Sequence, residues 1–591
     1  MDYTPDQEKA INDRPAGNLL VSASAGSGKT RVLVDRIIKM VKNHEANIDQ
    51  LLVVTFTNAA AKEMRQRLQR SLREEFNATD SPQEKAALLT QIQKVSVADI
   101  TTMDAYCQKL VSRYYYILGI DPNFRILSDD TEKELLKDQA WQDVREDLYG
   151  NDQDGSFARL TENFSNDRSD DGLTNVVYKM DEFASVTDDP DGWLENSAQF
   201  YDFQGQSLIK SDFYRQFIKP QIDDFFSQVE MDHFLMIQLA QQAELFKDEE
   251  ALDKQLDSLK NLKQHIDNCS SWDELRDAVN QFTFDKLPSA TGLEADQQKV
   301  HTQIRDINNS IKNKDKRFQK FQARYFLLNE ATNIKIMQAA KGRIEKLVAV
   351  VQQFRQAYRE LKNQRHLMEF IDIEHAAYDI LNNSSDQAKL IQQKLQNQYY
   401  EIMVDEYQDN NRLQDAILNK IAKPDQGNRF MVGDSKQSIY RFRLADPQMF
   451  IDKEESYTDQ DNDNELVSLA ENFRSAQNID DFTNLIFEQI MDKQVGEIDY
   501  SKAKLKFGNT EALKSYPSKV SLLIYENSTG AGDEEVEDTQ IEDSDTGQVE
   551  MIAQKKFAPC WIITSKFMIT IIYVISRPVT LPSSRQPTIV S

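Results

Sequence analysis

Seven short runs rich in apolar, β-branched or aromatic residues recur along the chain, and most precede a stretch with helical periodicity. Such runs predict strands covered on both faces, and strands that alternate with helices indicate a parallel sheet. The expected fold class is therefore α/β. The expected strands are residues 19–22, 51–55, 98–102, 399–404, 429–432, 466–469 and 520–525.

Several helices have clear start signals. Thr4 followed by Pro5 predicts a capped helix, and Asn58 is the expected N-cap of the helix after the second strand. Further helices are expected over residues 82–94 and from residue 103. The helix expected over residues 29–41 carries its core-facing positions in helical phase at Val32, Leu33, Arg36, Ile37 and Met40.

From about residue 128 to about residue 365 the pattern changes: glycine is sparse and the periodicity is helical throughout. This predicts a helical insertion of more than two hundred residues. Within it, residues 308–326 interleave basic and aromatic side chains, a mixture that suits single-stranded nucleic acid. The favoured interpretation is a helix with one apolar face and one solvated basic face.

Length and composition narrow the class of protein. A chain of 591 residues suggests roughly four domains, and 28% charged residues with a mean hydropathy of −0.62 suit a helix-rich soluble protein. The net charge of −27 argues against a uniformly basic DNA-coating protein but allows a local basic channel.

Cysteine usage and the N-terminus indicate a reducing compartment. Cys107, Cys269 and Cys560 are far apart, and the chain is expected to have no CxxC or Cys/His spacing, so disulfide scaffolds, zinc sites and Cys-ligated iron–sulfur clusters are not expected. Residues 1–9 are polar and have no signal-peptide character. A cytoplasmic location is expected.

The first chemical motif is ASAGSGKT, residues 23–30, between the first strand and its helix. Backbone N–H groups of such a loop cradle phosphates, and the helix N-terminus adds positive potential. Lys29 is expected to reach the β- and γ-phosphates of ATP, and Thr30 to ligate Mg2+. Alanine replaces the usual first glycine. The expected ATP-binding loop residues are Ala23, Ser24, Ala25, Gly26, Ser27, Gly28, Lys29 and Thr30.

The second motif is IMVDEYQDN, residues 402–410, in which a hydrophobic strand ends in two carboxylates. Asp405 is expected to hold Mg2+ through water, and Glu406 to orient and deprotonate the attacking water. The alternative, an exposed acidic turn, is disfavoured by the phosphate-binding loop elsewhere in the chain.

Two later segments complete the expected nucleotide site. Gln437 in VGDSKQSIYRFR is placed to sense the γ-phosphate, and Arg474 in LAENFRS to act as an arginine finger. Phe473 is expected to stack on adenine. Gln7 is expected to present its amide to the adenine edge, although a Gln at this position is more often an ordinary helix residue.

Aromatic residues at the strand ends suggest contacts with DNA bases. Phe56 follows the second strand at the carboxyl edge of the sheet, where ligands bind in α/β folds. Tyr440 and Phe442 offer further stacking faces, with core aromatic residues as the alternative. The expected DNA-binding residues are Phe56, Thr57, Asn58, Tyr440 and Phe442.

These motifs stand in the order found in superfamily 1A helicases of the UvrD/RecB type, which this chain resembles over about residues 1–550. GDSKQSIYRFRLADPQMF and VDEYQDNNRLQ look closest to the AddA component of AddAB helicase–nucleases. DPNFRILSDD, residues 121–130, and LMEFIDIEHAAYDIL, residues 367–381, resemble the segments that open and close that family's first inserted domain.

The resemblance implies a P-loop NTPase (RecA-like) parallel sheet core with a large all-helical insertion and an incomplete second RecA-like domain. The first RecA-like domain would comprise residues 1–126 and 367–463, the helical insertion residues 127–366, and the start of the second RecA-like domain residues 464–529.

The resemblance also implies function. It indicates an ATP- and Mg2+-dependent 3′–5′ DNA helicase component of a helicase–exonuclease complex for double-strand break repair and recombination. The implied partners are single-stranded DNA, duplex ends and the AddB component of an AddAB-type heterodimer, without a membrane. The resemblance implies that family members continue for several hundred residues with further helicase motifs and a nuclease domain, which are not expected in this sequence. The alternative function is a truncated remnant that binds nucleotide or DNA without unwinding or nuclease activity.

The end of the chain differs from the rest. Residues 530–550 read as an acidic linker, whereas residues 551–591 contain no Asp or Glu. The apolar stretch there allows three interpretations: a membrane anchor, a buried strand pair, or an aberrant, out-of-frame tail. The third is favoured.

Overall fold

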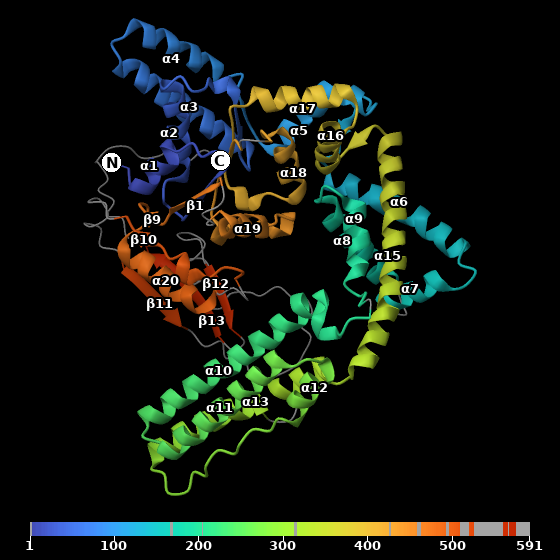
Figure 1. Cartoon of the computed structure of the whole chain (residues 1–591), viewed down its shortest axis with the longest axis vertical. Coiled ribbons are helices and arrows are strands. Elements are labelled where there is room, and N and C mark those ends of the chain that lie inside the picture. Colours follow the sequence, from blue (N-terminus) through green and yellow to red (C-terminus); the bar gives the residue numbers. More distant parts are fainter. Residues whose placement is uncertain are drawn as a thin grey trace, which may run out of the picture. The chain divides into compact units, whose positions relative to one another are not determined.

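The computed structural model describes residues 3–165, 169–203, 205–312, 316–424, 427–457, 463–491, 496–508, 519–524, 560–564 and 567–574 (Figure 1). The chain divides into two compact units. One unit comprises Met1–Lys109 with Leu381–Ser591, and the other comprises Leu110–Ile380. The domain boundaries expected from the sequence stay a prediction.

A six-stranded parallel sheet organises the first unit, with the order β3-β2-β6-β7-β1-β8. Most of its strand residues are fully buried, as expected for a sheet covered on both faces. The predicted α/β class is confirmed. The strands are β1 (Leu19–Ala23), β2 (Leu51–Val54), β3 (Asp99–Thr101), β6 (Glu401–Val404), β7 (Arg429–Gly433) and β8 (Glu465–Leu469).

Strands from the two ends of the chain alternate in this sheet. β6 lies between β2 and β7, and β1 lies between β7 and β8. β8 is the strand expected at residues 466–469. It pairs with β1 in register from Leu19↔Glu465 to Ala23↔Leu469, so it completes the first sheet.

Helices surround the sheet. The helix α2 lies where the sequence predicted it and packs its apolar face on the sheet. Its apolar residues in helical phase are buried in the core that covers the sheet. Arg36 is 1% exposed and its guanidinium makes two hydrogen bonds, of 2.9 and 2.6 Å, to the Glu401 carboxylate of β6. The helices of this unit are α1 (Pro5–Asn12), α2 (Lys29–Lys42), α3 (Asn58–Ala78), α4 (Pro82–Lys94), α17 (Asp386–Gln398), α18 (Arg412–Ile421), α19 (Gln448–Ser456) and α20 (Gln477–Ile490). The boundaries between the two units fall within α5 (Met103–Tyr114) and α16 (Phe370–Asn382).

The predicted helix caps are partly confirmed. Thr4 caps α1, and the backbone N–H of Thr4 donates in return to the Gln7 side chain at 3.1 Å. At α3 the prediction is wrong by one residue: Thr57 is the N-cap, and its hydroxyl accepts from the Ala60 N–H at 3.1 Å. Thr57 has the extended backbone that an N-cap residue adopts, so the helix begins one residue later, at Asn58.

The second unit is helical, as predicted, apart from a two-strand pairing of β4 (Arg125–Ile126) with β5 (Leu367–Met368). It contains two apolar cores, one among α10–α14 and one that joins α6–α9 to the second half of α15. Figure 1 shows α10, α11 and α13 side by side. The helices are α6 (Asp130–Gly150), α7 (Ser156–Phe164), α8 (Asp171–Ser185), α9 (Pro190–Gln199), α10 (Lys219–Gln242), α11 (Phe246–Asn268), α12 (Trp272–Gln281), α13 (Ala295–Lys312), α14 (Arg317–Tyr325) and α15 (Glu330–Gln364).

The basic and aromatic segment at residues 308–326 packs its aromatic face into the core, as the favoured interpretation of a helix with one apolar and one basic face predicts. Phe318 and Phe321 of α14 are 3% and 6% exposed and belong to the first of these cores. Arg317 pairs with Asp232 of α10. The aromatic rings of this segment are therefore used for packing.

Shorter strands follow the main sheet. β9 (Glu471–Asn472) pairs with β10 (Lys506–Phe507), and β11 (Lys519–Ile524), β13 (Phe567–Val574) and β12 (Cys560–Thr564) form an antiparallel sheet. The pairing of β12 with β13 agrees with the strand-pair interpretation of the tail. The acidic linker at residues 530–550 lies outside the described residues, as does the rest of the tail.

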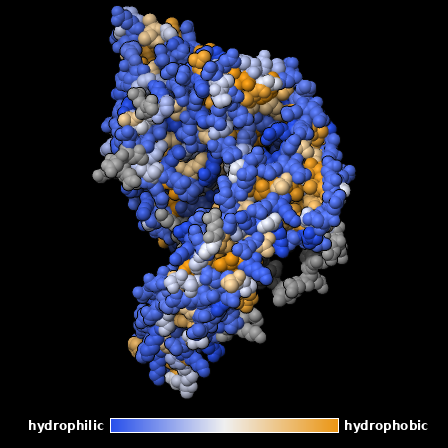
Figure 2. All heavy atoms as spheres, turned by 45° about the vertical axis from the view of Figure 1, so that its right-hand side comes forward, coloured by the Kyte–Doolittle hydropathy of each residue, from blue (hydrophilic) through white to orange (hydrophobic). Residues whose placement is uncertain are grey.

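One face of the surface can be followed in the space-filling view (Figure 2). The face in Figure 2 is predominantly hydrophilic, with small hydrophobic patches. Across the described part of the chain, no helix combines the length and apolar character that a membrane crossing requires.

Candidate nucleotide and DNA site

The segment at residues 23–30 has the geometry of a phosphate cradle. β1 ends at Ala23, and α2 begins at Lys29 with Gly28 as its N-cap. Gly26 and Gly28 adopt φ angles of +74° and +87°, which favour glycine. The first N–H groups of α2 have no partner within the helix, so they can receive an anion. Among the described residues, the buried Ser27 hydroxyl has no hydrogen-bond partner.

Two predicted catalytic residues meet beside this loop. The Lys29 ammonium group lies 2.8 Å from a carboxylate oxygen of Glu406, which follows β6. Glu406 has a φ of +52°, an uncommon backbone conformation for a residue with a side chain. The sheet order brings these residues together although 377 positions separate them.

Asp405 is suited to a divalent cation. Burial and the neighbouring Glu406 charge raise the pKa of Asp405 to about 6, whereas the Lys29 ammonium acts in the opposite direction. Burial and the Glu406 charge outweigh the Lys29 charge, so an added cation would stabilise the ionised form of Asp405. Carboxylate oxygen is also a preferred ligand of Mg2+. Thr30, the other predicted ligand, is the second residue of α2 and adjoins Lys29.

Asp409, which the sequence reasoning did not select, belongs to the same cluster. Burial and the Glu406 charge raise its pKa to about 7. Its Oδ1 is buried without a hydrogen-bond partner among the described residues. The DEYQD run contains this residue, so the sequence did carry a signal for it.

Gln437 lies in the loop after β7, the strand that adjoins β1. Its amide donates to the Asp434 carboxylate at 2.6 Å, and Lys436 lies 2.8 Å from the other Asp434 oxygen. Asp434 is 1% exposed. The predicted sensor is therefore held by a buried carboxylate that the sequence reasoning missed.

The segment after β8 packs directly on the phosphate loop. The Ser24 N–H donates to the Leu469 carbonyl at 2.9 Å, and the Phe473 N–H donates to the Gly26 carbonyl at 3.0 Å. These bonds place the predicted finger Arg474 beside the loop. A Cβ built on Gly26 would lie 2.8 Å from the Arg474 Cβ.

Asn472 fixes this segment and was not selected from the sequence. Its side-chain oxygen accepts from the Arg474 and Ser475 N–H groups at 2.8 and 3.1 Å. Its amide donates to Asp480 at 2.8 Å. Burial raises the pKa of Asp480 to about 6, against the effect of this hydrogen bond.

A small pocket adjoins the phosphate loop. It is lined by residues that include Gln7, Ser27 and Phe473. The Gln7 amide donates to the Ser27 carbonyl at 2.9 Å while its oxygen accepts from Thr4. Gln7 therefore joins α1 to the phosphate loop, which is a structural role.

The predicted base-stacking residues form one cluster. The Phe56 and Tyr440 ring centroids are 4.3 Å apart, and those of Tyr440 and Phe442 are 5.9 Å apart. The Arg443 guanidinium lies 5.6 to 5.9 Å from all three ring centroids, and this residue was missed from the sequence. Phe442 is 76% exposed, so it is not a core residue.

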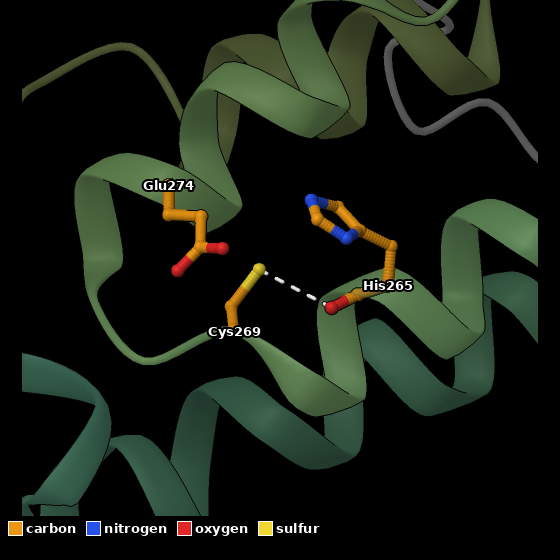
Figure 3. Close-up of side chains that lie close together, drawn as sticks. All are labelled: His265, Cys269 and Glu274. Carbon is orange, nitrogen blue, oxygen red and sulfur yellow. Dashed lines mark hydrogen bonds between the residues drawn. The ribbon is translucent and has the colours of Figure 1, made fainter.

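The helical unit holds a group with metal-ligand side chains, shown in Figure 3. The expectation that the chain has no Cys/His spacing is wrong, since His265 and Cys269 are four residues apart and adjoin Glu274, with ligand atoms within 4.8 Å. The Cys269 thiol donates to the His265 carbonyl at 3.3 Å, and Glu274 accepts two hydrogen bonds from Ser270. The first bond belongs to the end of α11 and the other two to the start of α12, so ordinary helix-end contacts account for these side-chain positions without an ion.

Comparison with known proteins agrees with this geometry. Residues 3–458 match the model of the UvrD/REP helicase N-terminal domain. The chain is 43% and 41% identical to the A-type subunits of the ATP-dependent helicase/nucleases of Levilactobacillus brevis and Ligilactobacillus salivarius, over 94% of this chain and 44% of each relative. It is 38% identical to the corresponding protein of Latilactobacillus sakei, over 94% of this chain and 62% of the relative.

The chain thus spans less than half the length of the first two relatives. The match to the helicase domain covers the phosphate loop, the carboxylate pair and the aromatic cluster. The chain therefore belongs to the UvrD/REP helicase family.

Proposed function

We propose that this chain is the ATP-driven motor portion of an AddA-type DNA helicase/nuclease component. The observation that carries the proposal is that the Lys29–Glu406 pair lies where loops from four strands of one parallel sheet meet. Those loops follow β1, β6, β7 and β8, and they bring together a phosphate cradle, a carboxylate pair, Gln437 and Arg474.

Each group has a defined task in ATP hydrolysis. The loop N–H groups and Lys29 bind the phosphates, and Thr30 and Asp405 would hold Mg2+, which neutralises phosphate charge when bound. Glu406 orients a water molecule and accepts its proton. Gln437 contacts the γ-phosphate, and Arg474 stabilises the charge that develops on it.

The aromatic cluster supplies the DNA contact. Phe56, Tyr440 and Phe442 present ring faces to bases, and Arg443 adds a positive charge at the same place. Thr57 and Asn58, at the exposed start of α3, extend this surface. The net charge of −27 is compatible because the contact is local.

The assembly is proposed from the relatives. The expected first RecA-like domain, helical insertion and start of a second RecA-like domain would move against one another and drive 3′–5′ translocation. An AddB-type partner, duplex ends and a cytoplasmic location belong to the same proposal. Exonuclease activity would belong to the longer relatives.

The test is ATPase activity of this chain with and without single-stranded DNA. We expect turnover that DNA stimulates and that Lys29→Ala abolishes. Nucleotide binding without turnover in the unaltered chain would instead indicate the alternative, a remnant that binds nucleotide or DNA without acting as a motor.

A further inference from the structure

We infer that Gln408 is a positioning residue that holds the Glu406 carboxylate and links it to the γ-phosphate sensor Gln437. This inference rests on the proposed role of Glu406 as the base. Gln408 lies in the short helix Tyr407–Asp409, directly after the carboxylate pair, and is 1% exposed.

The side chain of Gln408 has hydrogen bonds at both ends of its amide. Its Nε2 donates to Glu406 Oε2 at 3.0 Å and to Asp409 Oδ2 at 3.3 Å. Its Oε1 accepts from the Asp434 N–H at 3.0 Å. Because a buried amide with both ends bonded has one favoured orientation, Gln408 is fixed between the β6 and β7 loops.

The link continues to the predicted sensor. Asp434 receives the Gln437 amide at 2.6 Å on one carboxylate oxygen, and Lys436 lies 2.8 Å from the other. Only Gln408 and Asp434 therefore separate Glu406 from Gln437. A displacement of Gln437 by the γ-phosphate would be transmitted to the base through these hydrogen bonds.

The packing leaves Gln408 little freedom. A Cβ built on Gly433 would lie 2.4 Å from the Gln408 Oε1 and 2.8 Å from the Phe450 ring, so glycine is required for this close approach. Glu406 itself has a φ of +52°, and side-chain restraints help to keep such a residue in one conformation.

Gln408 also explains how Glu406 stays oriented during the reaction. Glu406 Oε2 accepts from both Lys29 and Gln408. Once Lys29 binds phosphate, it no longer restrains the carboxylate. The Gln408 amide then remains as the donor that keeps Glu406 directed at the attacking water.

The test compares Gln408→Met, which keeps the volume but removes the hydrogen bonds, with Gln408→Glu, which keeps only the acceptor. We expect kcat of the DNA-stimulated ATPase to fall about 10- to 100-fold in both. KM for ATP and the Kd of a fluorescent ATP analogue should change less than threefold. Gln396→Met is the matched control, since Gln396 is a partly buried Gln bonded to a carbonyl away from the site.

A double-mutant cycle tests the link to the sensor. If Gln408 and Gln437 act through one path, Gln408→Met combined with Gln437→Ala should cost clearly less in kcat than the product of the two single losses. Independent, multiplicative losses would overturn the link.

Other outcomes are equally decisive. The positioning role would be overturned if Gln408→Met left kcat unchanged. It would also be overturned if the loss of kcat came with an equally large loss of nucleotide affinity and a lower thermal midpoint. Should Gln408→Met unfold, the same measurements on Gln408→Glu decide. Full turnover in Glu406→Gln would overturn the proposed role of Glu406 as the base. Full turnover in the Gln408 variants, with turnover lost in Glu406→Gln, would overturn only the positioning role of Gln408.

Discussion

The Lys29 ammonium group lies 2.8 Å from the Glu406 carboxylate, so the cation of the phosphate loop and the proposed base neutralise each other. Their side chains are 12% and 35% exposed, so solvent still screens the pair in part. The phosphates of ATP must compete with Glu406 for Lys29. Nucleotide binding therefore frees the carboxylate at the moment when it is needed.

Glu406→Gln should separate binding from hydrolysis. We expect turnover to fall at least about 100-fold, because the proton acceptor is lost. Nucleotide affinity should stay equal or rise up to about fivefold, because an ion pair worth about 0.2–1 kcal/mol no longer competes. Steady-state ATPase and a fluorescence titration measure both. Glu63→Gln, an exposed carboxylate on α3, is the control, and unchanged hydrolysis in Glu406→Gln would reassign the base.

Gly26→Ala should disable the phosphate loop. The new Cβ would meet the Asn472 side-chain oxygen at 2.2 Å, at a φ of +74°. We expect a lower thermal midpoint and at least a tenfold loss of nucleotide affinity, measured by thermal unfolding and titration. Gly119→Ala is the control, since it has a φ of +67° but nothing within 4 Å. It should cost only the backbone strain, about 1–2 kcal/mol. Equal effects of the two variants would show that the clash with Asn472 is not the cause of the loss.

Phe442→Ala should weaken single-stranded DNA binding. Base stacking on an aromatic residue is worth about 1–3 kcal/mol, so Kd should rise about 5- to 150-fold in an anisotropy titration. Ile439→Ala removes an apolar side chain of similar exposure three residues away and should leave Kd unchanged. Similar losses in both would mean that the segment as a whole, rather than stacking, supports binding.

Arg443→Ala should weaken binding in the same titration, and the salt dependence should show how Arg443 contacts DNA. If Arg443 contacts a phosphate, the slope of log K against log salt concentration should decrease by about one. If it stacks on a base between the three rings, affinity should fall with little change of slope. An unaltered affinity would exclude Arg443 from the DNA contact.

Asp480→Asn should stabilise the protein at neutral pH. Burial raises the pKa of Asp480 to about 6, above the ordinary value of about 3.9. The folded state therefore binds more protons than the unfolded state between about pH 4 and 6, and stability falls as pH rises through that window. The penalty is at most about 3 kcal/mol.

An Asn at position 480 still accepts from Asn472 without that penalty. The thermal midpoint of the variant should exceed that of the unaltered chain at pH 7.5 and match it near pH 4. Asp481→Asn removes an exposed neighbouring charge that also raises the pKa of Asp480, so it should show a smaller difference of the same sign. A lower midpoint at pH 7.5 would show that ionised Asp480 stabilises the fold.

Local patterns were enough to predict most of the main sheet. The six strands lie within two residues of their predicted bounds because each is a short apolar run with its own end signal. The place of β8 could not be predicted in this way. Its pairing with β1 joins Leu19 to Glu465, and strand order depends on contacts that no short window contains.

The candidate site shows the same limit. Lys29 and Glu406 could be selected because each lies in a motif with a known chemical task. Asn472 and Gln408 could not, since their importance depends on hydrogen bonds and close approaches between loops. Arg443 was missed because its three aromatic neighbours come from two strand ends.

The alternation of strands in the main sheet has a consequence for synthesis of the chain on the ribosome. Among the described strands, β1 pairs with β7 and β8, and the Asn18 side-chain oxygen accepts a hydrogen bond from the Arg429 N–H 411 positions later. At a synthesis rate of about 5–20 residues per second, roughly 20–80 s pass between synthesis of the apolar β1 segment and synthesis of its first strand partner. During that time its backbone edges are open to non-native pairing, so chaperones that shield nascent chains should matter more for this protein than for one with neighbouring strands adjacent in sequence.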